Sequence, residues 1–170
     1  MITDNDMQHL RRCVELATEA LEAGDEPFGS VLVDGEGYVL REDRNRANTV
    51  DETYHPEIAV AQWAAKNMTV DARAQAVVYT SGEHCAMCSA AHAWAGLDRI
   101  VYVSSSKQLG EWMKEMGVKS SSPINTLSIQ EVAPDVPVEG PIAGLDAEVK
   151  ALQQRSFQKG SFQKDSFQKD

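Results

Sequence analysis

The spacing of apolar residues predicts an amphipathic helix near the N-terminus. From residue 7 to residue 23 apolar side chains recur at every third or fourth position, and Gly24 stands where this helix would end. Two short β-prone runs follow at 29–34 and 38–44, joined by the turn sequence Asp-Gly-Glu-Gly. Glycine supplies the positive φ angle that such a turn needs, so these runs are predicted to form a β-hairpin.

Helices and strands are then predicted to alternate. The polar stretch 41–54 is predicted to be a loop, and residues 55–67 have helical spacing, with Pro56 in the first turn, where its missing N–H costs nothing. Strands are expected at 75–81, 99–104 and 126–132, and helices at 85–95 and 107–116. This order predicts an α/β fold with three layers, α/β/α, around a central mixed five-stranded sheet that is largely parallel after its initial hairpin.

The composition changes after Pro134. A connector rich in proline and glycine leads to a predicted helix at 145–155, and the unit Ser-Phe-Gln-Lys-Gly/Asp then occurs three times from Ser156 to Asp170. Short polar units of this kind cannot bury a core. We therefore expect one domain, residues 1–155, followed by a tail, residues 156–170, that is disordered or was added artificially.

Composition and charge narrow the function classes. Hydrophobic residues make up 42% of the chain and charged residues 25%, as in globular proteins. The formal net charge is −10, so nucleic acid is not expected as a partner. The sequence has neither an apolar run long enough for a membrane span nor the pattern of a secretory signal. We expect a cytoplasmic protein with reduced thiols.

Two short motifs contain residues that bind metals. His55 and Glu57 stand at the start of one predicted helix, and Cys85 and Cys88 stand at the start of another. The two cysteines are three residues apart, so both can reach one ion, and the helix N-terminus favours their thiolate form. Three protein ligands on zinc leave a fourth position for water, which is a catalytic arrangement. A carboxylate at Glu57 could move the protons of that water.

Other interpretations of these residues are open. A Cys-x-x-Cys pair alone would also fit structural thiols or a redox pair, but His55 and Glu57 favour the metal site. His92, four residues after Cys88, could complete a closed four-ligand site. Its place one full turn inside the helix favours a packed or pocket-lining side chain instead.

The motifs together resemble the cytidine deaminase-like superfamily of zinc-dependent nucleobase and nucleoside deaminases. The resemblance covers most of residues 5–132 and rests on Pro27-Phe28-Gly29, Asn45, Asp51-x-Thr53-x-His55-x-Glu57 and Tyr79-Thr80-Ser81-x-Glu83-x-Cys85-x-x-Cys88. It implies the cytidine deaminase-like fold, one Zn²⁺ per chain on His55, Cys85 and Cys88, proton transfer by Glu57, and a homodimer. The backbone N–H of Cys85, at a helix start, is our candidate for stabilising developing negative charge.

Two positions depart from the family pattern. His84 replaces the usual proline before the first cysteine, and Pro56 replaces the usual alanine between His55 and Glu57. In the family these positions lie at the edge of the substrate pocket, so both are candidate substrate-binding residues. Pro56 has no N–H and would lose any substrate hydrogen bond from that donor. His84 could equally be a solvent-facing spacer.

The remaining pocket candidates favour a small base as substrate. Phe28 and Trp94 are expected to stack on a flat ring, or to pack in the core, and Asn45 is expected to pair with the edge of the ring. Trp94 and the Asp51-x-Thr53-x-His55 segment resemble guanine deaminases, so the expected reaction converts guanine to xanthine and ammonia. Cytosine, cytidine or guanosine is the first alternative. A transfer-RNA adenosine deaminase would need a basic surface, and a non-catalytic zinc-stabilised binding protein would have no use for Glu57.

Overall fold

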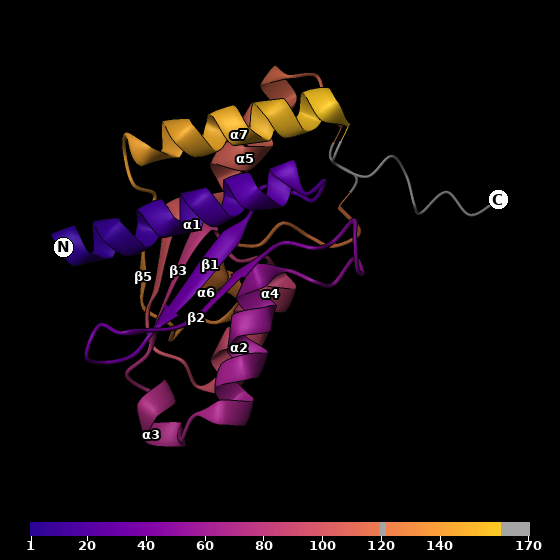
Figure 1. Ribbon diagram of the computed structural model, residues 1–170. Coiled ribbons are helices and arrows are strands. Elements are labelled where there is room, and N and C mark those ends of the chain that lie inside the picture. The colour runs from indigo at the N-terminus through magenta and orange to yellow at the C-terminus, as the bar shows by residue number, and fades with distance from the viewer. Residues whose placement is uncertain (120–121, 161–170) are drawn as a thin grey trace.

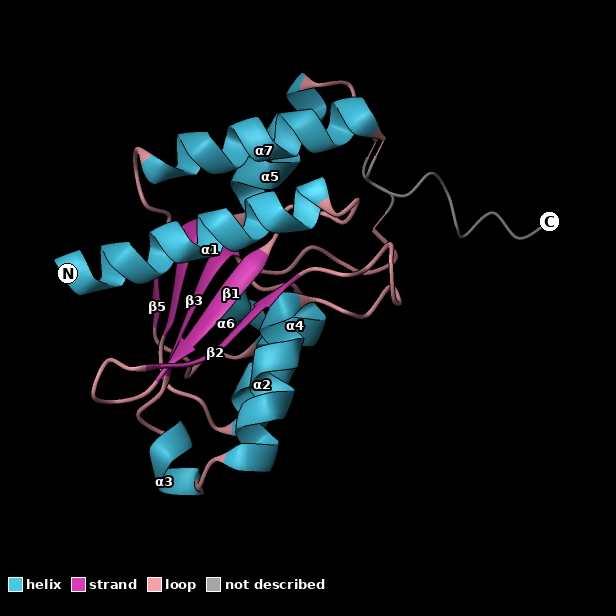
Figure 2. Ribbon diagram, viewed as in Figure 1, coloured by secondary structure: helices cyan, strands magenta, loops and turns pink. Residues whose placement is uncertain are grey.

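The computed structural model describes residues 1–119 and 122–160. Figures 1 and 2 show a central sheet with helices on both faces. The strands are β1 (Gly29–Val33), β2 (Val39–Arg44), β3 (Val77–Gly82), β4 (Ile100–Ser104) and β5 (Val138–Glu139). The helices are α1 (Asp4–Glu22), α2 (Pro56–Asn67), α3 (Val70–Arg73), α4 (Ala86–Ala95), α5 (Ser106–Glu115), α6 (Ile129–Val132) and α7 (Leu145–Lys159).

The sheet has the strand order β2-β1-β3-β4-β5. β1 pairs antiparallel with β2 and with β3, whereas β3 with β4 and β4 with β5 are parallel. This confirms the predicted hairpin and the mixed five-stranded α/β architecture. β2 extends to Arg44, so the loop that leads to α2 begins at residue 45, not at residue 41.

Alternate residues of the strands point to the two faces of the sheet, as the two-residue period of a β-strand requires. Val31, Tyr79 and Val101 face the layer of α1 and α7, and Leu32 and Val78 face the layer of α2 and α4. Figure 1 shows α1, α5 and α7 together above the sheet, with α2 and α4 below it. Fully burying an aliphatic side chain contributes about 1.5–3 kcal/mol, so both layers hold the sheet firmly.

The fifth strand lies outside the segment predicted for it. Residues 126–132 were expected to be a strand, but Ser128 and Glu131 form a capping box that begins α6. The carboxylate of Glu131 accepts from the backbone N–H of Ser128 at 2.8 Å. The strand that completes the sheet is β5, inside the connector rich in proline and glycine, where Val138 pairs with Ile100.

Helix α7 continues past its predicted end at residue 155. It reaches Lys159, Ser156 is buried against the domain, and Gly160 ends the helix with a φ of 68°. The domain boundary predicted at residue 155 therefore lies too early in the chain, because the first repeat unit forms the last turn of α7. Residues 161–170 lie outside the described residues. Within the described ranges, no helix combines the length and apolar character needed to cross a bilayer.

Candidate active site

Two helices present their first residues to the same point. His55 is the N-cap residue of α2, Cys85 is the N-cap residue of α4, and Cys88 lies in the first turn of α4. The Sγ atoms of Cys85 and Cys88 each lie 3.6 Å from Nδ1 of His55. The three ligand atoms lie within 4.8 Å of one another, because α2 packs beside α4. The fold thus brings the three expected ligands together.

These donor atoms fit a tetrahedral zinc ion. Zn–S bonds of about 2.3 Å and Zn–N bonds of about 2.0–2.1 Å at a tetrahedral angle separate sulfur and nitrogen by about 3.5 Å, close to the observed distances. Two thiols and one imidazole are also the borderline-soft donors that zinc prefers. His92 is not a fourth ligand, since its ring is buried and its Nε2 lies 2.7 Å from the carbonyl oxygen of Asp98. Within the described ranges the cluster has three ligands, the number expected of a catalytic site.

One of the three ligands, the Cys85 thiol, already has the ionised form that binds a cation near neutral pH. A hydrogen bond from Cys88 and the neighbouring His55 lower the pKa of the Cys85 thiol to about 4. The same pairing and burial raise the pKa of the Cys88 thiol. Burial lowers the pKa of the His55 imidazole, but Cys85 and Glu57 outweigh it and raise the value to about 9. A metal ion would therefore displace protons from Cys88 and His55 as it binds.

Glu57 stands beside the three ligands without being one of them. Its carboxylate lies 3.4 Å from Oγ1 of Thr80 and 3.8 Å from Sγ of Cys88, and the residue is 5% exposed. Burial raises the pKa of its carboxyl to about 7, although His55 acts in the opposite direction. A carboxyl with a pKa near neutrality can both accept and release a proton, which is what a general acid and base must do.

Asn45 and Phe28 lie on adjacent segments near this cluster. The backbone N–H of Asn45 donates to the carbonyl of Phe28 at 3.0 Å, and the Asn45 side chain accepts from the N–H of Ala47. Asn45 is buried, and its Nδ2 has no hydrogen-bond partner in the described ranges. A buried donor without a partner costs about 1–3 kcal/mol, so this amide is available to a ligand. Phe28 packs its ring over Gly82, where an added Cβ would come within 2.9 Å of the ring.

Two expected pocket residues lie elsewhere. Trp94 is 92% exposed near the end of α4, because the buried face of this helix consists of Cys88, Ser89, His92 and Ala95. Its side chain therefore lies on the outer face of the helix. His84 is 0% exposed, and its ring contacts that of His92 edge to face with 5.6 Å between centroids. It is therefore neither a solvent-facing spacer nor a residue at an open pocket edge, whereas Pro56 is buried beside His55 as the first residue of α2.

The sequence analysis missed the roles of two acidic residues near the cluster. The carboxylate of Glu83 accepts from the backbone N–H groups of Ser106 at 2.9 Å and Ile129 at 3.1 Å, which begin α5 and α6. Glu26 is largely buried and interacts electrostatically with His55. Glu83 could have been suspected from its place in the cysteine motif. No local pattern distinguishes Glu26, because its proximity to His55 arises only when the sheet forms.

The chain is similar in sequence to known deaminases. The family model described as MafB19-like deaminase matches residues 4–134. A probable cytosine deaminase of Schizosaccharomyces pombe is 30% identical over 116 residues, covering 68% of this chain and 70% of the relative. The guanine deaminase of Bacillus subtilis is 33% identical, and the match covers 63% of this chain and 69% of that protein. A tRNA-specific adenosine deaminase of Haemophilus influenzae is 31% identical, covering 62% and 61%.

Solved structures share the fold. The guanine deaminase of Bacillus subtilis superposes with a TM-score of 0.55 and 26% identity, covering 78% of this chain and 91% of that one. A protein from a study of tRNA:A34 deaminases gives a TM-score of 0.61 and 25% identity, covering 86% and 99%. Another protein, solved in complex with 8-azaguanine, gives a TM-score of 0.67 and 20% identity. That match covers 88% of this chain and 82% of the other. Deaminases of free bases and of transfer RNA are thus comparably similar to this chain.

Proposed function

The chain belongs to the MafB19-like deaminase family and is a hydrolytic deaminase, and we propose that it converts the free base guanine to xanthine and ammonia with one zinc ion per chain. The observation that carries this proposal is the three-ligand cluster of His55, Cys85 and Cys88 with the buried carboxyl of Glu57 beside it. Such a cluster leaves a coordination position for water. A binding protein without turnover would have no use for that arrangement.

The proposed mechanism assigns proton transfer to Glu57. Zinc, when bound by the three ligands, supplies a Lewis acid that makes water a better nucleophile near neutral pH. Glu57 takes one proton from the attacking water and delivers it to a ring nitrogen. It then takes the proton of the added hydroxyl and passes it to the amine, which leaves as ammonia while the carbonyl of the product forms. Thr80, 3.4 Å away, orients its carboxylate. The backbone N–H of Cys85, at the start of α4, is proposed to stabilise negative charge that develops in the transition state.

The assignment to a free base is supported by the pocket candidates and by the charge of the chain. The free Nδ2 of Asn45 can donate to the edge of a ring, and Phe28 can stack on its face. The net charge of −10 disfavours transfer RNA, although relatives that act on transfer RNA are comparably similar. Pro56 can contribute its ring but no backbone N–H donor. The three free cysteines favour a reducing compartment such as the cytoplasm.

We also propose that the protein is a homodimer joined through the outer face of α4. This helix contains no Asp, Glu, Lys or Arg, and its one histidine is counted as neutral. Trp94 is 92% exposed on it. Small or apolar residues, Met87, Ala90 and Ala91, are partly exposed on the same helix. An uncharged helix face around an exposed tryptophan is typical of a protein interface.

An assay of ammonia release tests the proposed activity. Purified protein should contain about one zinc ion per chain and should deaminate guanine with a kcat/KM above that for guanosine, cytosine, cytidine, adenine and a transfer-RNA stem-loop. The Cys85→Ala, Cys88→Ala double variant should lose both zinc and activity. A higher kcat/KM for cytosine would change the substrate and leave the reaction class intact. Stoichiometric zinc in the double variant would refute the metal assignment.

A further inference from the structure

Two adjacent carboxylates in the connection between α1 and β1 have opposite environments. Asp25 is fully buried and accepts from Nη1 of Arg44, from the backbone N–H groups of Asn48 and Thr49, and from the Thr49 hydroxyl. The carboxylate of Glu26 accepts no hydrogen bond and forms no ion pair in the described ranges, although the residue is only partly exposed. Asp25 therefore anchors the loop that leads to α2, whereas the carboxylate of Glu26 is available to a ligand.

The main chain after Glu26 is fixed at the site. The carbonyl of Phe28 accepts from the N–H of Asn45, and the hydroxyl of Thr80 lies 3.4 Å both from the carbonyl oxygen of Gly29 and from Oε1 of Glu57. The two residues that follow Pro27 are thus held beside Asn45, through Phe28, and beside Thr80, the neighbour of the Glu57 carboxyl, through Gly29.

The charge of Glu26 acts on the same site. Its carboxylate and the imidazole of His55 interact electrostatically, and burial raises the pKa of the Glu26 carboxyl. A carboxyl group that is desolvated in this way gains from any hydrogen-bond donor that a ligand supplies, because no donor within the described ranges is bonded to it. Its partial exposure leaves room for such a donor.

We propose that Glu26 is a specificity-determining residue, whose carboxylate accepts a hydrogen bond from a ring N–H of the substrate while Asn45 donates to a neighbouring acceptor. This inference rests on the proposed deaminase function. Guanine has such an N–H at N1, next to the carbon that carries its amine. Cytosine has acceptors at N3 and O2 instead, and these would face a carboxylate unfavourably. Glu26 therefore selects bases with a ring N–H beside the reacting carbon.

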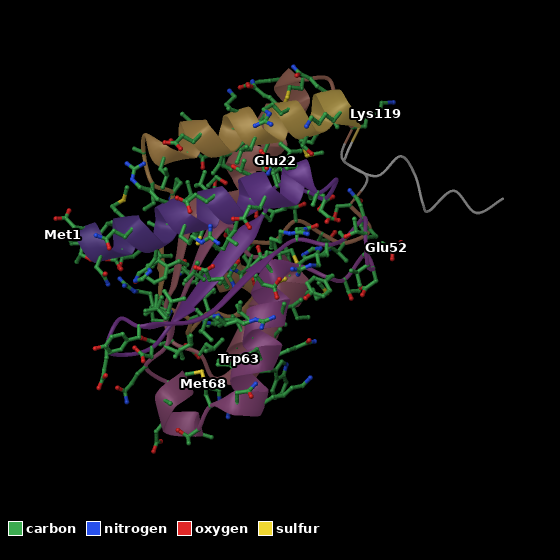
Figure 3. The ribbon with its side chains drawn as sticks, in the orientation of Figure 1. Met1, Glu22, Glu52, Trp63, Met68 and Lys119 are labelled. Atoms are coloured by element: carbon green, nitrogen blue, oxygen red, sulfur yellow. The ribbon has the colours of Figure 1, made fainter. Side chains whose placement is uncertain are left out.

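The variant Glu26→Gln tests this role with little change in shape, because it replaces an acceptor by a group that also donates. A hydrogen bond to a charged group is worth about 1.5–3 kcal/mol, so kcat/KM for guanine should fall by roughly 10- to 100-fold, mostly through KM. The value for cytosine should stay the same or rise. Glu22→Gln removes an equal charge from the exposed end of α1, labelled in Figure 3, and should change neither value.

Binding without turnover provides a second measurement. In a Glu57→Gln background, adding Glu26→Gln should weaken binding of 8-azaguanine by a similar factor while zinc content and Tm stay unchanged. An unchanged guanine-to-cytosine ratio, or equal loss for both bases, would overturn the role of Glu26. Failure of the wild type to release ammonia from any base would refute the proposed function itself, so the two failures can be told apart.

Discussion

At the scale of single residues, Glu57 should contribute to catalysis without contributing to metal binding. It is 5% exposed, lies 3.8 Å from Sγ of Cys88, and is not one of the clustered ligands. Glu57→Gln cannot transfer the proton, so kcat should fall by about 10²- to 10⁴-fold while zinc content is retained.

Steady-state kinetics and metal analysis of the same preparations check this prediction. The exposed loop residue Glu52, labelled in Figure 3, provides a control, because Glu52→Gln should keep the wild-type kcat. A Glu57→Gln enzyme with near-normal turnover would remove Glu57 from the mechanism.

The metal ligands could be predicted from the sequence because each pair lies within one turn of a helix start. His55 with Glu57, and Cys85 with Cys88, are local patterns whose chemistry depends on spacing. The orientation of Trp94 could not be predicted in this way. It depends on which face of α4 packs against α2 and α6, and that choice is made by residues distant in the chain.

At the scale of helices and strands, Glu83 connects the cysteine segment to two helices. Its carboxylate accepts from the first N–H groups of α5 and α6, and its own N–H donates to the carbonyl of Ser104. Glu83→Gln should weaken zinc binding by about 10- to 100-fold, because Cys85, two residues on, would lose its fixed position. Competition with a chelator measures this affinity.

Glu131→Gln is the matched control for that experiment. Glu131 also accepts from a backbone N–H, that of Ser128, but it is exposed and caps only α6. This variant should lower Tm slightly and keep the wild-type zinc affinity. If Glu83→Gln bound zinc as tightly as Glu131→Gln does, the proposed positioning role would be wrong.

Long elements with clear periodicity were predictable, and short ones were not. α2 and α4 lie where helical spacing placed them, and Gly96 ends α4 with a φ of 68°. β5 has two residues, and pairing with β4 rather than β-propensity makes it a strand. The helix α6 forms instead of the expected strand because the Ser128 capping box satisfies its first N–H groups.

At the scale of the whole molecule, a polar network joins α1 to the sheet. Oδ1 of Asp6 accepts from the Tyr79 hydroxyl at 2.6 Å and from Nη2 of Arg99 at 2.9 Å, and Arg99 also pairs with Glu139 of β5. Burial would raise the pKa of Asp6, but the hydrogen bonds from Tyr79 and Thr3 and the charge of Arg99 lower it to about 2.

The stability contributed by Asp6 should therefore depend on pH in a defined direction. A lowered pKa means that the ionised carboxylate stabilises the fold above its usual pKa, and that this contribution disappears as the pH falls from about 4 to about 2. Asp6→Asn should lower the free energy of unfolding by about 2 kcal/mol at pH 7 and by much less near pH 2. Urea denaturation across this range checks it, and a constant difference would contradict it.

The proposed homodimer depends on the exposed face of α4. An aromatic residue at the centre of an interface often contributes 2 kcal/mol or more, so Trp94→Glu should weaken a dimer by about 30-fold or more.

Sedimentation equilibrium should show the wild type as a dimer and this variant as a monomer at the same concentration. Val70, 68% exposed on α3, supplies the control, because Val70→Glu changes another exposed apolar residue away from α4 and should stay dimeric. Since the zinc ligands lie at the opposite end of α4 from Trp94, the monomeric variant should keep its zinc. Equal masses for the wild type and Trp94→Glu would show that α4 does not form the interface.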